Sequence, residues 1–112
     1  MNLRGRRSAF FSVDFDRQFR WYLEHAGERV AVRFLTAVTH TVEQLTRRPE
    51  IGRTRRFRHP ELQGFRSFRV QPPFDAHLLF YRVVGSELSI ERMMHGRRNL
   101  PRRLLEPPGS GD

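Results

Sequence analysis

Two amphipathic helical patterns meet at a single glycine, and this junction constrains the fold more than any other feature of the sequence. In the second pattern, from Glu28 to Arg47, apolar residues recur every three or four positions. They form one stripe: Ala31, Phe34, Leu35, Val38, Val42 and Leu45. Gly27 stands where the end of a helix favours glycine. Because the turn is so short, we expect two antiparallel helices packed as a hairpin.

The first helical pattern follows Asp14, a residue type that caps helix N-termini. Its apolar face is made of Phe15, Phe19, Tyr22, Leu23 and Ala26. Trp21 points away from this face. His40 lies opposite the stripe of the second helix, so we expect it to face solvent. Pro49 and Gly52 end the second helix.

Strand patterns lie on both sides of the two helices. Residues 8–13 form a short apolar segment that predicts a strand. Residues 51–63 form a basic loop for which we predict no regular element, although its arginines could hold a backbone phosphate: Arg53, Arg55, Arg56 and Arg58. Gly85-Ser86 is a two-residue hairpin turn. We predict three further strands, at 65–70, 76–84 and 87–95.

This order of elements predicts an α+β fold. An N-terminal strand and a three-stranded antiparallel meander would form a sheet, and the helical hairpin would pack on it. The near-continuous apolar run at 76–84 predicts a central strand covered on both faces. We assign one domain to residues 1–106 and a flexible Pro/Gly/Ser tail to residues 107–112. Residues 96–105 suit one helical turn capped by Asn99.

The charge of the chain is strongly positive. The formal net charge is +9, and all 21 basic residues are arginine, with no lysine. Such a chain attracts polyanions: nucleic acid, a ribosome or an acidic protein. Arginine keeps its proton near neutral pH, so acid–base chemistry would have to use His, Tyr, Asp or Glu. The chain has no cysteine, which excludes disulfides, thiolate zinc sites and cysteine nucleophiles.

Several further classes of site lack a signal in the sequence. The five histidines show no metal-ligand spacing, and no glycine motif that cradles phosphates is present. No serine has the context of a nucleophile elbow. We therefore predict no cofactor and no metal. No apolar run is long enough to span a membrane and no signal peptide is recognisable, so we expect a cytoplasmic protein without a membrane partner.

Two arginines occupy strand positions in phase with core residues. Their neighbours on the same side are Leu78, Phe80 and Val84 for Arg82, and Leu88, Ile90 and Met94 for Arg92. Burying an unpaired guanidinium costs several kcal/mol. One interpretation is that each arginine snorkels to solvent or pairs with a glutamate such as Glu91 or Glu61. The other is an exposed, concave, cationic end of the sheet.

The last predicted strand ends in His95-Gly96-Arg97-Arg98. An imidazole and two guanidiniums in one patch can hold a phosphate or a carboxylate cluster. The same four residues also fit a strand end with solvated charges. The pattern alone does not separate these two interpretations.

Four segments carry a family resemblance: Arg48-Pro49-Glu50-Ile51-Gly52, Pro60-Glu61-Leu62-Gln63-Gly64-Phe65-Arg66, His77-Leu78-Leu79-Phe80-Tyr81-Arg82 and Met93-Met94-His95-Gly96-Arg97-Arg98-Asn99-Leu100. With the two helices before them, they resemble ParE-type toxins of the RelE/ParE superfamily, the plasmid-stabilisation toxins of bacterial type II toxin–antitoxin modules. The resemblance covers about residues 8–105. It implies a helical hairpin followed by an antiparallel sheet, in agreement with the predicted order.

The resemblance also implies a partner, a cognate antitoxin. The C-terminal segment of such an antitoxin wraps the toxin and its N-terminal part binds operator DNA. A toxin–antitoxin hetero-oligomer is then expected, with operator DNA contacted only through the antitoxin. A basic chain with an apolar groove suits an acidic amphipathic segment that folds on binding. We predict contacts with the antitoxin at Trp21, Phe68, Leu79 and Tyr81.

The resemblance leaves two cellular targets open. ParE-like toxins inhibit DNA gyrase by trapping its cleavage complex without chemistry of their own. RelE-like toxins are ribosome-dependent endoribonucleases that use Lys, Arg and a C-terminal Tyr. This chain has no lysine, and Leu100-Pro101 follow the His-Gly corner where that Tyr would stand, which favours gyrase. The residues predicted to bind the target are Arg82, Arg92, His95, Arg97 and Arg98.

The alternative is an endoribonuclease in which His95 is the general base and Arg82 and Arg92 clamp the phosphate. Histidine suits this task because its ordinary pKa lies near neutral pH. A third interpretation is a degenerate member of the family that only binds its antitoxin.

Overall fold

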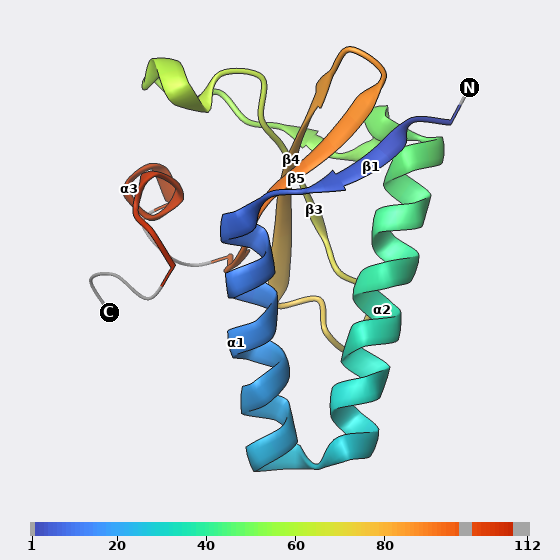
Figure 1. The fold of residues 1–112 in the computed structure, drawn as a ribbon. Helices are drawn as coiled ribbons and strands as arrows, with labels where there is room; N and C mark the ends of the chain where they lie inside the picture. The colour runs from blue at the N-terminus through green and yellow to red at the C-terminus, as the bar shows by residue number, and fades with distance from the viewer. Residues whose placement is uncertain (1, 97–99, 109–112) are drawn as a thin grey trace.

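The computed structural model describes residues 2–96 and 100–108. Its elements in chain order are β1 (Arg4–Arg7), α1 (Ala9–Ala26), α2 (Glu28–Arg47), the 3-10 helix η1 (Pro49–Ile51), β2 (Arg53–Thr54), the 3-10 helix η2 (Pro60–Leu62), β3 (Arg66–Arg69), β4 (His77–Val84), β5 (Glu87–His95) and α3 (Leu100–Leu105). Figure 1 shows α1 and α2 side by side, with both helices extending beyond the lower end of the sheet.

The strands form one sheet in the order β1-β5-β4-β3-β2. β1 runs parallel to β5, and the other neighbours are antiparallel. The predicted α+β fold with its hairpin and meander is therefore confirmed. The loop predicted at 51–63 is wrong in part, because two of its residues form β2 and pair with β3. Gly85 makes the predicted turn between β4 and β5 with φ of 60°.

The helical hairpin has the predicted form, but its first helix begins earlier than expected. α2 spans the predicted residues, and Gly27 joins the helices at φ of 94°. The strand predicted at 8–13 is wrong. Ser8 is the N-cap of α1: its Oγ accepts the Phe11 N–H at 3.0 Å and donates to the Glu91 carbonyl at 2.6 Å. A short apolar run does not distinguish strand from helix, and here the capping serine decides.

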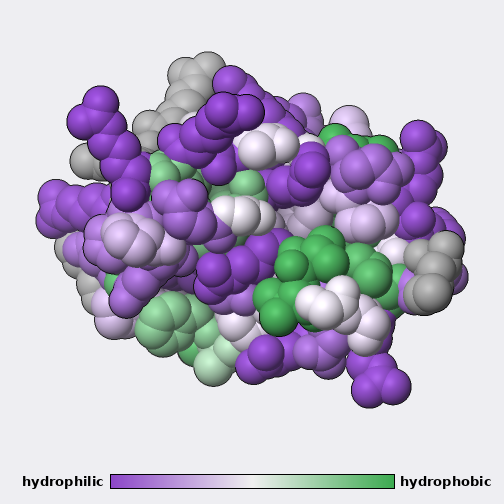
Figure 2. Space-filling view, turned by 90° about the horizontal axis from the view of Figure 1, so that it is seen from above, coloured by the Kyte–Doolittle hydropathy of each residue, from purple (hydrophilic) through white to green (hydrophobic). Residues whose placement is uncertain are grey.

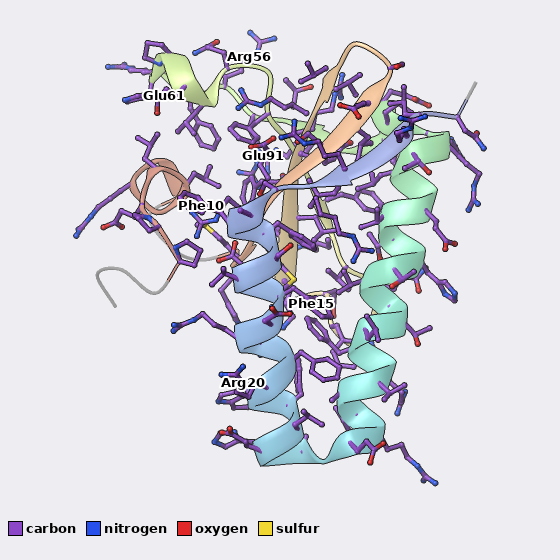
Figure 3. The ribbon with its side chains drawn as sticks, viewed as in Figure 1. Phe10, Phe15, Arg20, Arg56, Glu61 and Glu91 are labelled. Atoms are coloured by element: carbon purple, nitrogen blue, oxygen red, sulfur yellow. The ribbon has the colours of Figure 1, made fainter. Side chains whose placement is uncertain are left out.

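One hydrophobic core lies between the hairpin and the sheet. Phe34 is fully buried at its centre, with the Phe15 ring stacked on it at 5.4 Å and the Tyr22 ring at 4.9 Å. Figure 3 shows Phe15 between the two helices and Arg20 pointing away from α2. The predicted stripes are wrong at Leu23, Ala26 and Leu35, which are exposed on the hairpin.

A second hydrophobic core covers the opposite face of the sheet. Its residues come from η2, the position before β3, β4 and α3: Leu62, Phe65, Leu78, Phe80 and Leu104. β4 is thus covered on both faces, as predicted. α3 confirms the predicted helical turn near the C-terminus. Its predicted cap, Asn99, and residues 109–112 of the predicted tail lie outside the described residues.

A β-bulge in β5 decides which side chains face which core. Phe80 pairs with Arg92 and Tyr81 with Ile90, so Glu91 is an extra residue between them. Leu88 and Ile90 face the hairpin core, whereas Arg92 lies on the opposite face. The prediction that these residues share one side is therefore wrong, because an inserted residue inverts the alternation of a strand.

Candidate functional site

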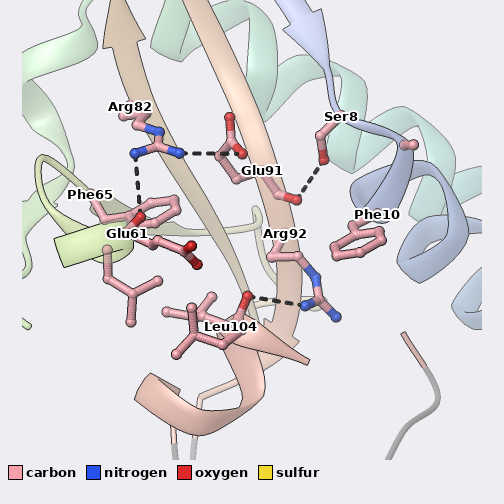
Figure 4. Close-up of a pocket in the computed structure, with 11 residues that line it drawn as sticks. Ser8, Phe10, Glu61, Phe65, Arg82, Glu91, Arg92 and Leu104 are labelled. Atoms are coloured by element: carbon pink, nitrogen blue, oxygen red, sulfur yellow. Dashed lines mark hydrogen bonds and ion pairs between the residues drawn. The ribbon is translucent and has the colours of Figure 1, made fainter. Parts of the chain in front are cut away.

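A cavity of about 420 Å³ lies between α3, η2 and the start of α1, on the face of the sheet opposite the hairpin. Leu62, Phe65 and Leu104 supply apolar walls, and the guanidinium of Arg82 lies over the Phe65 ring, 4.8 Å from its centroid. Figure 4 shows Arg82, Glu91 and Glu61 at one end of this cavity and Arg92 with Phe10 at the other.

Arg82 is a partly exposed cation held in place by several weak contacts. Its side chain is 34% exposed, and Nη2 lies 3.9 Å from a carboxylate oxygen of Glu91. Nη1 donates to the carbonyls of Glu61 and Gln63 at 3.4 and 3.5 Å. Pairing with Glu91 was one of the two interpretations of the sequence. Because the guanidinium is neither buried nor tightly paired, it remains accessible to an anion.

Arg92 is buried, and its guanidinium is already bound. Nε and Nη2 donate to the two carboxylate oxygens of Asp14 at 2.8 and 3.1 Å. Nη1 donates to the carbonyl of Glu106 at 2.6 Å. The residue is only 4% exposed. The prediction of Arg92 as an exposed target contact is therefore wrong, because the acidic partner comes from α1 and no spacing in the sequence reveals it.

His95 does not join the two arginines. It pairs with His77 in the sheet, and the two rings lie 5.6 Å apart. Arg82 pairs with Ser89 near the other end of the same strands. His77 and Arg82 are separated by five positions on β4, about 17 Å along an extended strand. Arg82 and Arg92 line the same cavity, but His95 does not, so the structure separates the predicted base from the predicted phosphate clamps.

The other two predicted target contacts, Arg97 and Arg98, lie outside the described residues. The described part of the predicted target-binding set is therefore distributed between two ends of the β4–β5 hairpin rather than gathered in one patch.

His77 itself is a buried group in the hairpin core. Its Nε2 and the hydroxyl of Tyr22 are hydrogen-bonded at 3.0 Å. Burial, and secondarily the charge of His95, lower the pKa of His77 to about 4. Burial raises the pKa of Tyr22. At neutral pH the imidazole is neutral, which is what its apolar surroundings require.

The predicted antitoxin contacts divide by exposure. Trp21 is 49% exposed on α1, where its ring stacks on His25 at 4.4 Å. Phe68 is half-buried against the hairpin core. Leu79 and Tyr81 have no exposed surface, so the prediction that they contact a partner is wrong. They face the helices that cover β4, and strand alternation alone does not show which layer fills a given side.

Tyr81 instead fixes the connection that follows α2. Its hydroxyl donates to the Pro49 carbonyl at 2.6 Å and accepts the Gly52 N–H at 3.0 Å. A Cβ on Gly52 would lie 2.1 Å from that hydroxyl oxygen, so only glycine fits there. Burial raises the pKa of Tyr81, against the lowering effects of the Gly52 hydrogen bond and the Arg66 charge.

Exposed apolar side chains lie mainly on the hairpin and at the β4–β5 turn. On the helices they are Phe10, Val13, Trp21, Leu23, Val32 and Leu35. Val83 and Val84 are exposed beside an open hollow of about 810 Å³ at the turn. Figure 2 looks down on this end of the molecule and shows a green apolar patch among purple hydrophilic residues.

Two classes of site have no candidate in the part of the chain that the structure describes. No group of three metal-ligating side chains occurs there. Among the described helices, none is both long enough and apolar enough to cross a membrane.

Comparisons with known proteins agree on one family. Residues 8–100 match the family model of the ParE toxin of the type II toxin–antitoxin system parDE. The chain is 34% identical over 93 residues to Toxin ParE3 of Caulobacter vibrioides, which covers 83% of this chain and 86% of that protein.

Two solved structures share the fold. One is described as the chromosomal ParDE system from P. aeruginosa, with a TM-score of 0.67 and 19% identity over 83% of this chain and 95% of the other. The second is the toxin–antitoxin complex RelBE2 from Mycobacterium tuberculosis, with a TM-score of 0.59 and 21% identity over 85% and 92% of the two chains. These two likenesses concern the fold. The family match and the relative from Caulobacter vibrioides show that the chain belongs to the ParE family, the toxins of parDE-type toxin–antitoxin systems.

Proposed function

We propose that this toxin acts by binding DNA gyrase and trapping its cleavage complex, without catalysing a reaction of its own, and that a cognate antitoxin neutralises it. The observation that carries the non-catalytic mechanism is the separation of His95 from Arg82 and Arg92. A general base must lie within hydrogen-bonding reach of the proton it takes, and the cations must meet the same phosphate. Here the histidine lies at one end of the β4–β5 hairpin, and Arg92 is bound to Asp14.

The proposed contacts with the target are four of the residues that the sequence analysis selected. They are Arg82 beside the cavity, His95 at the end of β5, and the following Arg97 and Arg98. Arg92 is left out because its guanidinium is bound inside the protein. Operator DNA, on this proposal, is contacted only through the antitoxin in a toxin–antitoxin hetero-oligomer.

The antitoxin is proposed to cover the exposed apolar residues of the hairpin. Phe10, Val13 and Trp21 fall at i, i+3 and i+11 of α1, which places them along one side of the helix. Arg17 and Arg20 lie near the same line. An amphipathic segment with acidic residues at its edges complements both the apolar stripe and the positive charge.

A gyrase assay tests the target. Purified toxin is added to gyrase and relaxed plasmid with ATP, and supercoiling and double-strand cleavage are measured. We expect lost supercoiling and accumulated linear DNA, with both effects reversed by prior addition of the antitoxin. Normal supercoiling together with early arrest of translation would refute the gyrase proposal.

The ribonuclease alternative has a separate test. If His95 were a general base, His95→Ala would abolish cleavage of ribosome-bound mRNA while antitoxin binding persisted. On the gyrase proposal, neither the wild-type toxin nor this variant cuts mRNA. His40→Ala is a matched control, because His40 is an exposed histidine on α2.

A further inference from the structure

Three arginines gather on the sheet face opposite the hairpin, at the β2 edge. Arg53 pairs with Ser67 in the β2–β3 ladder, and the Arg55 N–H continues the ladder to the Phe65 carbonyl at 2.9 Å. Alternation places Arg53, Arg55 and Arg69 on the same face as Ser67. Arg55 confirms this placement, because its Nε donates to the Ser67 hydroxyl at 2.8 Å.

These arginines are held by neutral groups alone. Arg69 donates to the carbonyl of Asp75 at 2.7 Å. Arg55 bonds the Ser67 hydroxyl and lies over the Phe80 ring, 5.8 Å from its centroid. None of the three forms an ion pair with a carboxylate of residues 2–96 or 100–108, whereas Arg82, Arg92 and Arg102 each have one.

The three charges also act on one another. Burial, and after it the charges of Arg53 and Arg69, lower the pKa of Arg55. Arg53 and Arg69 are diagonal neighbours across the β2–β3 ladder, which puts their Cβ atoms about 7 Å apart. Bringing like charges together without a counter-charge is unfavourable, and a bound anion would remove that cost.

The surroundings of the cluster indicate what kind of anion fits. The large exposed apolar residues lie on α1, α2, the β4–β5 turn and α3, and none lies on β2 or β3. An amphipathic acidic peptide would therefore find charge here but no apolar contact. A nucleic-acid backbone needs only the charge and the planar donor pairs that guanidinium supplies.

We propose that Arg53, Arg55 and Arg69 form a binding site for the phosphodiester backbone of a nucleic acid. The site reads charge and not sequence, since guanidinium contacts to phosphate carry no base information. It makes no use of Arg82, His95 or the α3 cavity. It therefore stands whether or not gyrase is the target of the toxin.

Salt-dependent binding of the full chain tests the site. Fluorescence anisotropy is measured with a 16-base-pair DNA duplex and a 16-nucleotide single-stranded RNA over a series of salt concentrations. The test variant carries Arg53→Gln, Arg55→Gln and Arg69→Gln together. Each phosphate contact contributes about 0.9 to the slope of log K against log salt for duplex DNA and about 0.7 for single strands. We expect the slope to fall by about 3 on duplex DNA or about 2 on RNA, with affinity at least tenfold weaker.

A matched variant separates this site from net charge. Arg29→Gln, Arg33→Gln and Arg47→Gln together remove the same charge from exposed positions of α2. This control is expected to keep nearly the wild-type slope. Equal losses in the two triple variants would overturn the proposal.

A single substitution guards against misfolding. The side chain of Arg53 makes no hydrogen bond or ion pair with any part of the chain that the structure describes, and Gln keeps the backbone N–H and carbonyl of the β2–β3 ladder. Arg53→Gln should therefore leave the melting temperature unchanged and lower the slope by about 1. If one of the two nucleic acids binds more tightly to the wild type than to the triple variant, the site is supported. The nucleic acid that binds more tightly then identifies the class of ligand. If polyglutamate competes better than either nucleic acid, the ligand is an acidic polypeptide and the proposal is wrong.

Discussion

The two faces of the sheet differ in the kind of side chain that they carry. The hairpin face buries aromatic and aliphatic side chains, and its few polar groups are matched, as with Tyr81 between Pro49 and Gly52. The other face buries an ion pair, Arg92 with Asp14, beside an open cavity and an unpaired arginine cluster. The difference teaches that accessible charge is confined to one face of the sheet, where it lies beside groups that stabilise the fold. Substitutions on the first face should alter folding, and those on the second should divide into structural and functional effects.

The largest expected effect comes from the second face. Arg92→Met removes the guanidinium and leaves the Asp14 carboxylate buried without its partner. Breaking a buried pair in this way costs about 3 to 5 kcal/mol of unfolding free energy. Urea unfolding followed by circular dichroism measures the loss.

Arg82→Met is the matched control, because Arg82 lies on the same face but is partly exposed and weakly paired. Exposed ion pairs contribute about 1 kcal/mol or less. If the two variants lost the same stability, the distinction between the structural and the accessible arginine would fail.

A second prediction uses pH to probe the hairpin face. In the folded chain the pKa of His77 is lowered to about 4. As the pH falls below 6.5, the unfolded chain therefore binds a proton at this residue and the folded chain does not. Stability is therefore full above pH 6.5 and decreases as the pH falls towards 4, by about 3 kcal/mol at most.

Urea unfolding between pH 7.5 and 4 measures this dependence. His77→Gln keeps a hydrogen-bonding group near Tyr22 but has no titrating ring, so its stability curve should be flatter over the same range. His95→Gln is the comparison, since His95 is exposed. If the stability of His77→Gln fell with pH as steeply as that of the wild type, the pH dependence would come from groups other than His77.

A third prediction concerns the buried hydroxyl of Tyr81. Tyr81→Phe keeps the ring but leaves the Pro49 carbonyl and the Gly52 N–H without their partner. Unsatisfied buried groups cost about 1 to 3 kcal/mol, and the melting temperature measures the change. Tyr22→Phe, whose hydroxyl bonds only the His77 ring among the described residues, should cost less. The reverse order would show that Tyr81 does not fix the connection after α2.

The smallest effect on stability is expected at Trp21. Trp21→Ala removes an exposed ring and should change the unfolding free energy by roughly 0.5 kcal/mol or less. On the proposed function, the same variant should weaken antitoxin binding at least tenfold in calorimetry. Glu24→Ala, an exposed residue on the next turn of α1, is the control. Unchanged affinity for the antitoxin would remove Trp21 from that interface.

The helices were predictable because their signals are local. The 3.6-residue period and Gly27 gave α2 and the hairpin, and Gly85-Ser86 gave the turn between β4 and β5. Periodicity did not show that both helices extend beyond the end of the sheet, where no strand covers their apolar side chains (Figure 1). Leu23 and Leu35 fit their stripes and yet are exposed, because the contact that would cover them is a tertiary one.

The errors at the candidate site have a common cause, which is that pairing between distant segments is invisible to local patterns. The bulge at Glu91 inverted the expected side of Arg92, and its partner Asp14 is 78 residues away. Arg53 and Arg55 were predicted to lie in a loop whose arginines could hold a backbone phosphate, and Arg69 in a separate strand. The alternation of Arg53 and Arg55 was the only signal of the arginine cluster, and Arg69 joins it solely through the register of β2 and β3.

The strand β1 comes before the other elements in the sequence, but its partner β5 comes after all the other strands of the sheet. β1 pairs with β5, in a register that sets Arg4 against Glu87. Until the ribosome has made that distant segment, the first residues have no strand beside which to lie. A chain whose synthesis stops before β5 would therefore leave β1 without a partner and β4 with an open edge.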